Sequence, residues 1–135
     1  MATIKNFEDI HSWQKAREVC KYLGKLIEEG RFRKSFRLIS QIEASSGSIM
    51  DNIAEGFERG TRQEFIQFLG YAKGSCGELR SQLYRALDRN YLNEIEFNKL
   101  KEEVILISGL IQKLIKYLLN SEIAGVRKKQ QPKEP

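Results

Sequence analysis

Proline is missing from almost the whole of this 135-residue chain, since its two prolines are Pro132 and Pro135. Proline lacks a backbone N–H and clashes with the preceding turn, so it interrupts helices. Before residue 132 the chain therefore contains no residue that forbids a helix. Apolar side chains recur there every three or four positions, which is the spacing of one buried helix face. The sequence predicts an all-α protein.

Two of the predicted helices lie in the first half of the chain. The first runs from about residue 9 to residue 29 and ends at Gly30, because glycine readily adopts the left-handed conformation that terminates helices. The second begins after Ser35, a favourable N-cap, and continues to about residue 57. The predicted buried positions of these two helices are Ile10, Trp13, Ala16, Cys20, Leu23 and Ile27, then Ile39, Ile42, Ser46, Ile49 and Ile53.

The other two helices each begin with a capping box, in which a cap residue and a glutamate three positions later bond each other's free amides. A box at Thr61 starts a helix that continues to about residue 90, and a box at Asn93 starts one that continues to about residue 118. The connections are only about three to five residues long, so neighbouring helices must be antiparallel. The sequence therefore predicts an antiparallel up-down-up-down four-helix bundle over residues 1–119.

The composition fits a water-soluble domain, with 41% hydrophobic and 30% charged residues. No run of about 18 uncharged apolar residues occurs and the first residues do not resemble a signal segment, so we expect a cytoplasmic protein without a membrane partner. Cys20 and Cys76 are expected to be reduced core thiols. Residues 120–135 lose the helical spacing and are predicted to form a basic, mobile tail.

The second and third predicted helices carry rows of small and uncharged polar residues. Each mid-helix glycine costs about 1 kcal/mol relative to alanine, so a row of glycines indicates a close approach of another helix. The row could serve tight packing within one chain, or contact between copies with polar groups hydrogen-bonding across the interface. We favour a homo-oligomer, because a lone bundle needs only one buried stripe per helix. The predicted interface residues are Gln41, Ala44, Gly47, Ser48, Asn52, Glu55, Gly70, Gly74 and Gly77.

Basic residues gather near the predicted helix ends, and the net charge is +5. A charged loop is ordinarily just a solvated loop, but several cations at one end of a bundle could also neutralise phosphates of RNA or DNA. The predicted nucleic-acid-binding residues are Arg31, Arg33, Lys34, Arg37, Arg85 and Arg89 at one end and Arg59 and Arg62 at the other.

The sequence offers no set of residues for catalysis. His11 is the one histidine, and neither clustered cysteines nor Glu-x-x-His pairs are present to bind a metal ion. Ser48 and Cys76 have no predicted base beside them, and the glycines of the third helix do not follow a strand as a phosphate loop requires. We therefore expect a protein that is not an enzyme and has no cofactor.

The second predicted helix also carries a specific motif. The run from Gln41 to Gly56 contains Gln41-Ile42, Ser48-Ile49 and Asn52-Ile-Ala-Glu-Gly. It resembles the signature of the four-helix bundle proteins encoded in intervening sequences of bacterial 23S rRNA genes, sometimes called S23 ribosomal proteins. The resemblance spans about residues 4 to 118.

This resemblance implies closed rings of five bundles and brings no catalytic residue with it. A more distant likeness reaches the accessory variability determinant protein of diversity-generating retroelements, a basic bundle pentamer that binds a reverse transcriptase and nucleic acid. We therefore expect a self-associating, pentameric bundle that binds RNA or DNA, with a protein such as a reverse transcriptase as a further partner. The alternative is an interaction scaffold or accessory subunit with no nucleic-acid role.

Overall fold

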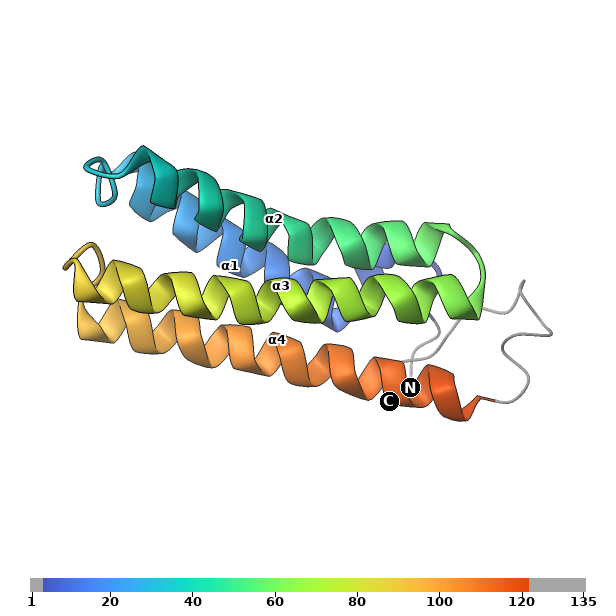
Figure 1. The fold of residues 1–135 in the computed structure, drawn as a ribbon. Coiled ribbons are helices and arrows are strands. Elements are labelled where there is room, and N and C mark those ends of the chain that lie inside the picture. The colour runs from blue at the N-terminus through green and yellow to red at the C-terminus, as the bar shows by residue number, and fades with distance from the viewer. Residues whose placement is uncertain (1–3, 122–135) are drawn as a thin grey trace.

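The computed structural model describes residues 4–121 and shows four long helices (Figure 1). Consecutive helices run in opposite directions, and each helix packs against two of the others, so that α1 also contacts α4. The predicted antiparallel four-helix bundle is confirmed, whereas its assembly into a ring stays a prediction. The elements are η1 (Phe7–Asp9, a short 3-10 helix), α1 (His11–Glu28), α2 (Phe36–Glu58), α3 (Arg62–Asp88) and α4 (Glu94–Asn120).

The predicted helix starts are close to the observed ones because the caps form. The Ser35 hydroxyl accepts the amide of Leu38, and at α4 both halves of the capping box between Asn93 and Glu96 are present. The box predicted at Thr61 forms only in part. Its hydroxyl accepts the Glu64 amide at 3.2 Å, but the Glu64 carboxylate accepts the Thr61 hydroxyl instead of the Thr61 amide.

The connections reverse the chain as expected, although the first and the third are each about two residues longer than the predicted five and three. They comprise residues 29–35, 59–61 and 89–93. Gly30 takes a φ of +82°, in the region that favours glycine, and turns follow it up to Ser35. At the other end of the chain α4 continues through Asn120, one residue beyond the predicted end of the bundle at residue 119. The predicted tail lies outside the described residues from residue 122 onward.

The core is a single apolar column along the inside of the bundle. The face of α1 that packs into it is rotated about the helix axis relative to the predicted face. Ala16 and Leu23 are buried as predicted, but Val19 and Leu26 complete the buried stripe. The predicted Trp13, Cys20 and Ile27 are only partly buried at its edge. Both sets have helical spacing, so periodicity alone could not choose between them.

Candidate functional site

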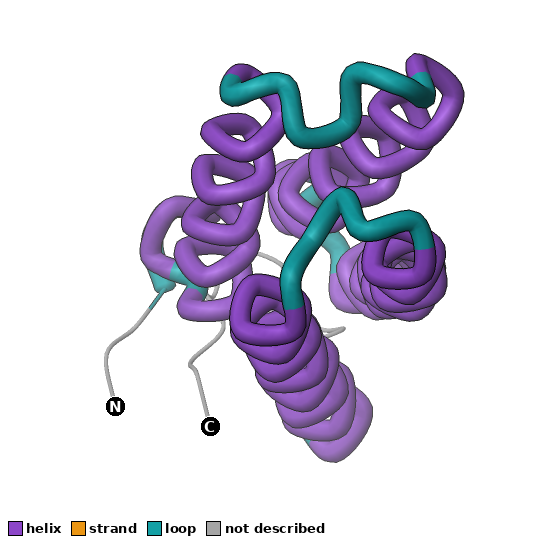
Figure 2. Tube along the Cα trace, turned by 90° about the vertical axis from the view of Figure 1, so that its left-hand side faces the viewer, coloured by secondary structure: helices purple, strands orange, loops and turns teal. Residues whose placement is uncertain are grey.

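The α1–α2 and α3–α4 connections lie at the same end of the bundle, where Figure 2 shows both loops facing the viewer. Phe32 from the first loop is fully buried, and its ring meets that of Tyr91 from the second at 5.7 Å, edge to face. Arg31 also joins the first loop to the start of α4 through a two-pronged ion pair with Glu96, at 2.7 and 2.6 Å. These contacts bring the six predicted cations of this end together.

The ion pair with Glu96 removes Arg31 from the cations available to a ligand. The hydrogen bonds from Arg31 are the main reason why the pKa of Glu96 lies below its ordinary value, and the same bonds raise the pKa of Arg31. Glu96 also caps α4 by accepting the Asn93 amide at 2.9 Å. Arg31 therefore holds the loop on α4, and its predicted contact with nucleic acid is not supported by its surroundings.

The other five cations of this end, Arg33, Lys34, Arg37, Arg85 and Arg89, are exposed, and we call them the basic end. Arg85 donates to the Gln41 side chain at 2.8 Å, and Arg33 donates to the Gly30 carbonyl at 3.5 Å. The side chains of Lys34, Arg37 and Arg89 make no hydrogen bond or ion pair within residues 4–121. Their charges are free to meet an anion.

Acidic side chains also lie at this end, but they are unevenly distributed. The exposed ones are Glu28, Glu29, Asp88 and Glu94. From residue 30 to residue 42, by contrast, the chain has four cations and no acidic residue. The first turn of α2 likewise contains no acidic side chain, so the positive end of its helix dipole is not neutralised there. The positive potential is therefore concentrated on the α1–α2 loop and the start of α2.

At the opposite end the two predicted cations are held by the chain itself. Arg59 pairs with Glu55 at 2.7 Å and with Glu64 at 3.3 Å, and its guanidinium lies 5.0 Å from the centre of the Phe68 ring. The hydrogen bond with Glu55 is the main cause of the raised pKa of Arg59.

Arg62 has a structural role at the same end. It donates to the carbonyls of Leu118 and Ser121, at 3.3 and 3.1 Å, and so satisfies acceptors that the end of α4 leaves open. Arg59 and Arg62, which we call the partnered end, thus join α2, α3 and α4. Their predicted role in nucleic-acid binding is not supported by these contacts.

The predicted polar interface row forms a seam between α2 and α3 of the same chain. The Ser45 hydroxyl donates to the Gln82 side chain at 2.6 Å, and the Ser75 hydroxyl donates to Ser48 at 3.0 Å. Asn52 donates to the Ser48 hydroxyl at 2.8 Å. These polar groups therefore obtain hydrogen bonds within the chain, and their predicted bonds across a subunit interface stay a prediction.

The predicted glycine row behaves differently, because it does not serve packing within the chain. Gly70, Gly74 and Gly77 are exposed, and a Cβ atom added at any of them would meet nothing within 4 Å. Gly47 on α2 has the same open space, and Ala44 is exposed. The alternative of internal packing is therefore wrong for these glycines, and contact between copies stays a prediction.

The glycine that internal packing does require is Gly56, which the interface prediction did not include. A Cβ atom there would lie 2.6 Å from the Cβ of Phe68 and 3.3 Å from the Phe65 ring. Real Cβ atoms do not approach this closely, so only glycine fits between α2 and α3 at this point. The sequence feature that could have indicated this close contact is the pair Phe65 and Phe68, which follows the α2–α3 connection.

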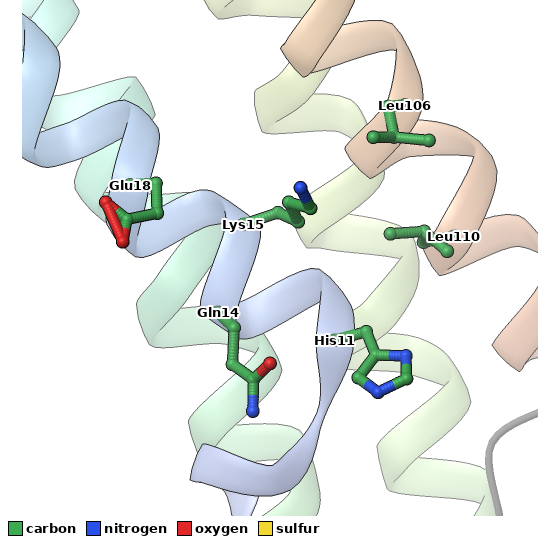
Figure 3. A pocket seen from close by; sticks show the side chains of 6 residues that line it. All are labelled: His11, Gln14, Lys15, Glu18, Leu106 and Leu110. Carbon is green, nitrogen blue, oxygen red and sulfur yellow. The ribbon is translucent and has the colours of Figure 1, made fainter. Parts of the chain in front are cut away.

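A groove between α1 and α4 was also missed by the sequence interpretation. It has a volume of about 460 Å³ and is lined by His11, Gln14, Lys15, Glu18, Leu106 and Leu110 (Figure 3). No group of three or more His, Cys, Asp or Glu residues placed to hold a metal ion occurs within residues 4–121. The lining therefore offers one imidazole beside mixed charges and an apolar wall.

The two thiols are not activated. Burial raises the pKa of Cys76 to about 12, and burial is also the main cause of the raised pKa of Cys20. Both cysteines are free, as expected. Within the described residues no helix is both long and apolar enough to cross a membrane.

Comparison with known proteins agrees with the architecture. A crystal structure of a protein with unknown function from the S23 ribosomal protein family of Bacteroides thetaiotaomicron superposes with a TM-score of 0.72 at 23% sequence identity. The match covers 78% of this chain and 98% of that one. At that identity it shows the shared fold alone.

Curated proteins and family models give different results. No curated protein matches the chain. The family model described as 23S rRNA-intervening sequence protein matches residues 8–113, which include all of α1, α2 and α3 and most of α4. This chain therefore belongs to the 23S rRNA-intervening sequence protein family.

Proposed function

We propose that this protein is a non-catalytic, self-associating helical bundle that binds nucleic acid through its basic end. The observation that carries the proposal is the stretch from residue 30 to residue 42, which has no acidic residue and, besides the ion-paired Arg31, three exposed cations. Lys34 and Arg37 in that stretch, and Arg89 across the loops, are exposed and have no partner among the described residues. Cations of this kind neutralise phosphates and release counterions, which supplies affinity for any nucleic-acid sequence.

The rigidity of the loop supports the same proposal. Phe32 and the Arg31–Glu96 ion pair hold the α1–α2 loop against the start of α4. A loop that is already ordered loses less conformational entropy when it binds. The backbone that carries Arg33 and Lys34 is therefore already held in place before a ligand binds.

The test is the salt dependence of RNA binding, measured by fluorescence anisotropy with a labelled RNA that contains both a hairpin stem and a single-stranded arm. Between about 50 mM and about 200 mM salt we expect a steep loss of affinity. The triple variant Arg33→Ala/Lys34→Ala/Arg37→Ala should bind at least roughly tenfold more weakly and reduce the slope by about 2, since each lost phosphate contact removes about 0.7–0.9.

The matched control removes three exposed cations at the other end, in Lys15→Ala/Lys113→Ala/Lys116→Ala. It changes the net charge equally, so equal loss of binding in both variants would mean general attraction rather than a site at the basic end. No binding by the wild-type protein at low salt would reject the nucleic-acid proposal.

We infer that self-association uses the exposed glycine row of α3 with the small residues of α2. Gly70, Gly74 and Gly77 leave room for another helix backbone to approach. Native mass spectrometry should find an oligomer, with a pentamer expected, and Gly74→Leu should dissociate it while the bundle stays folded. Gly109→Leu, at an equally open position on α4, is the control. Dissociation by that variant alone would locate the contact on α4 instead.

One observation favours the alternative of an interaction scaffold or accessory subunit. From Val104 to Gln112 the chain has no charged residue, and Ile105 and Leu106 in that stretch are each 45% exposed. A pair of exposed apolar side chains of this kind suits a protein partner, such as the reverse transcriptase expected from the more distant likeness. A partner that stays bound after nuclease treatment, and that is lost on Leu106→Lys, would favour this function over nucleic-acid binding.

A further inference from the structure

Phe36 and Ile95 are the two most exposed apolar side chains at the basic end, and Phe36 is the aromatic one. It is the first residue of α2 and is 81% exposed, although phenylalanine is normally buried. All seven phenylalanines of the chain lie within the described residues, and each of the other six has an aromatic ring within 6 Å of its own. Phe36 alone has no such ring contact.

The fold does not require a ring at this position. Ser35 already caps α2, and aromatic residues have lower helix propensity than straight-chain ones. Phe36 also does not belong to the apolar core or to the side chains that pack against it. Most of its surface is therefore open to water, and nothing in the folded chain stabilises that exposure.

The neighbours of Phe36 give the open ring a chemical context. It follows Arg33 and Lys34 and precedes Arg37, all three of which are exposed. A planar apolar surface among cations is the arrangement that binds single-stranded nucleic acid, where aromatic rings stack on bases and cations contact the adjoining phosphates. The charges of the loop are thus complementary to a strand that crosses Phe36.

We propose that an unpaired base of RNA or DNA stacks on Phe36 while Arg33, Lys34 and Arg37 bind the flanking phosphates. The inference rests on the proposed nucleic-acid function. It adds that the preferred ligand is a nucleic acid with an unpaired segment. A duplex would be bound less well, because its bases are stacked on one another and cannot lie against the ring. An anionic membrane is less suitable, because stable anchoring needs more apolar area than Phe36 and Ile95 together provide.

The experiment compares two labelled RNAs in fluorescence anisotropy at about 50 mM salt, a single-stranded oligonucleotide and a blunt duplex of the same length. Phe36→Ala should weaken binding of the single strand roughly tenfold, a typical loss for one stacked base, and leave duplex binding unchanged. Phe36→Trp should retain the affinity, and its fluorescence should be quenched when the single strand binds. The same measurement with single-stranded DNA shows whether the ribose 2′-hydroxyl matters.

The control is Tyr71→Ala, which removes another exposed ring, on the half of α3 away from the basic end. Equal binding of the single strand by the wild type and Phe36→Ala would overturn the stacking inference. The proposed function would still stand in that case if the Arg33/Lys34/Arg37 triple variant lost both RNAs. Absence of all RNA binding by the wild type, together with Phe36-dependent sedimentation with phosphatidylglycerol vesicles, would reject both proposals in favour of a membrane surface.

Discussion

The two ends of the bundle use the same residue types for different purposes. At the partnered end, Arg59 and Arg62 donate to carboxylates and carbonyls of the chain itself. At the basic end, Lys34, Arg37 and Arg89 have no acceptor within residues 4–121. A count of cations in the loops treats the two ends alike, but only at the basic end do the predicted loop cations have charge left for a ligand. The comparison teaches that free donors, rather than basic residues as such, indicate a binding surface.

The largest expected effect tests the packing beside the partnered end. Gly56→Ala would place its Cβ 2.6 Å from that of Phe68, so we expect the free energy of unfolding to fall by about 2 kcal/mol or more. Gly109→Ala, where the added Cβ meets nothing within 4 Å, should instead raise it by about 0.5–1 kcal/mol. Urea denaturation of both variants measures the difference. Equal effects at the two positions would contradict the tight contact at Gly56.

The next effect separates stability from binding at the partnered end. Arg62→Met keeps the apolar stem but removes the donors to Leu118 and Ser121, so the free energy of unfolding should fall by about 1 kcal/mol. RNA affinity should stay unchanged. A stable Arg62→Met protein with weakened RNA binding would show that both ends contact the ligand, and the comparison between them would then fail.

Glu96 provides a test within the basic end, because its ion pair makes Arg31 an exception there. Glu96→Gln retains a residue suited to the capping box of α4 but loses the negative charge that pairs with Arg31. We therefore expect the free energy of unfolding to fall by about 1 kcal/mol near neutral pH. The folded-state pKa of Glu96 is lowered from 4.5, so its contribution is present above pH 4.5 and disappears as the pH falls through the folded value. Thermal unfolding at about pH 7 and about pH 3 should show the two proteins converging at the lower pH. A difference that persists at about pH 3 would contradict an ionic contribution.

The smallest stability effect is expected for Arg37, whose side chain is exposed. Arg37→Met should change the free energy of unfolding by less than about 0.5 kcal/mol, as surface substitutions usually do. RNA affinity should nevertheless fall and the salt slope should decrease by nearly 1. We therefore expect opposite results for the two variants: Arg62→Met lowers the free energy of unfolding and leaves RNA affinity unchanged, whereas Arg37→Met lowers RNA affinity and leaves stability almost unchanged.

Much of the fold could be predicted from the sequence because its signals are local. The cap residues Ser35 and Asn93 and the terminating Gly30 act on backbone groups within four positions, so they mark helix ends without knowledge of the rest. The rotation of α1 could not be predicted in the same way. Val19 and Cys20 compete for the core at equally good helical spacing, and only the position of the neighbouring helices decides which is buried.

The candidate site was predictable in location but not in detail, because its contacts join distant parts of the chain. Short loops imply that the two loop clusters share an end, which the structure shows. The acceptors of Arg31 and Arg62 lie more than 50 positions away in sequence, so no local pattern reveals that these two cations are already used. Likewise, nothing in the run around Phe36 distinguishes an exposed ring from a buried one.

The hydrogen bonds between α2 and α3 also determine how any partner meets the molecule. If α3 slid along α2 by one turn, about 5.4 Å, the buried Gln82 would lose Ser45, and Ser75 would lose Ser48. Unsatisfied buried polar groups are costly, so the two helices are locked in one register. The exposed glycines of α3 therefore keep fixed positions relative to α2. A helix that docked on them would meet a surface whose shape is already formed.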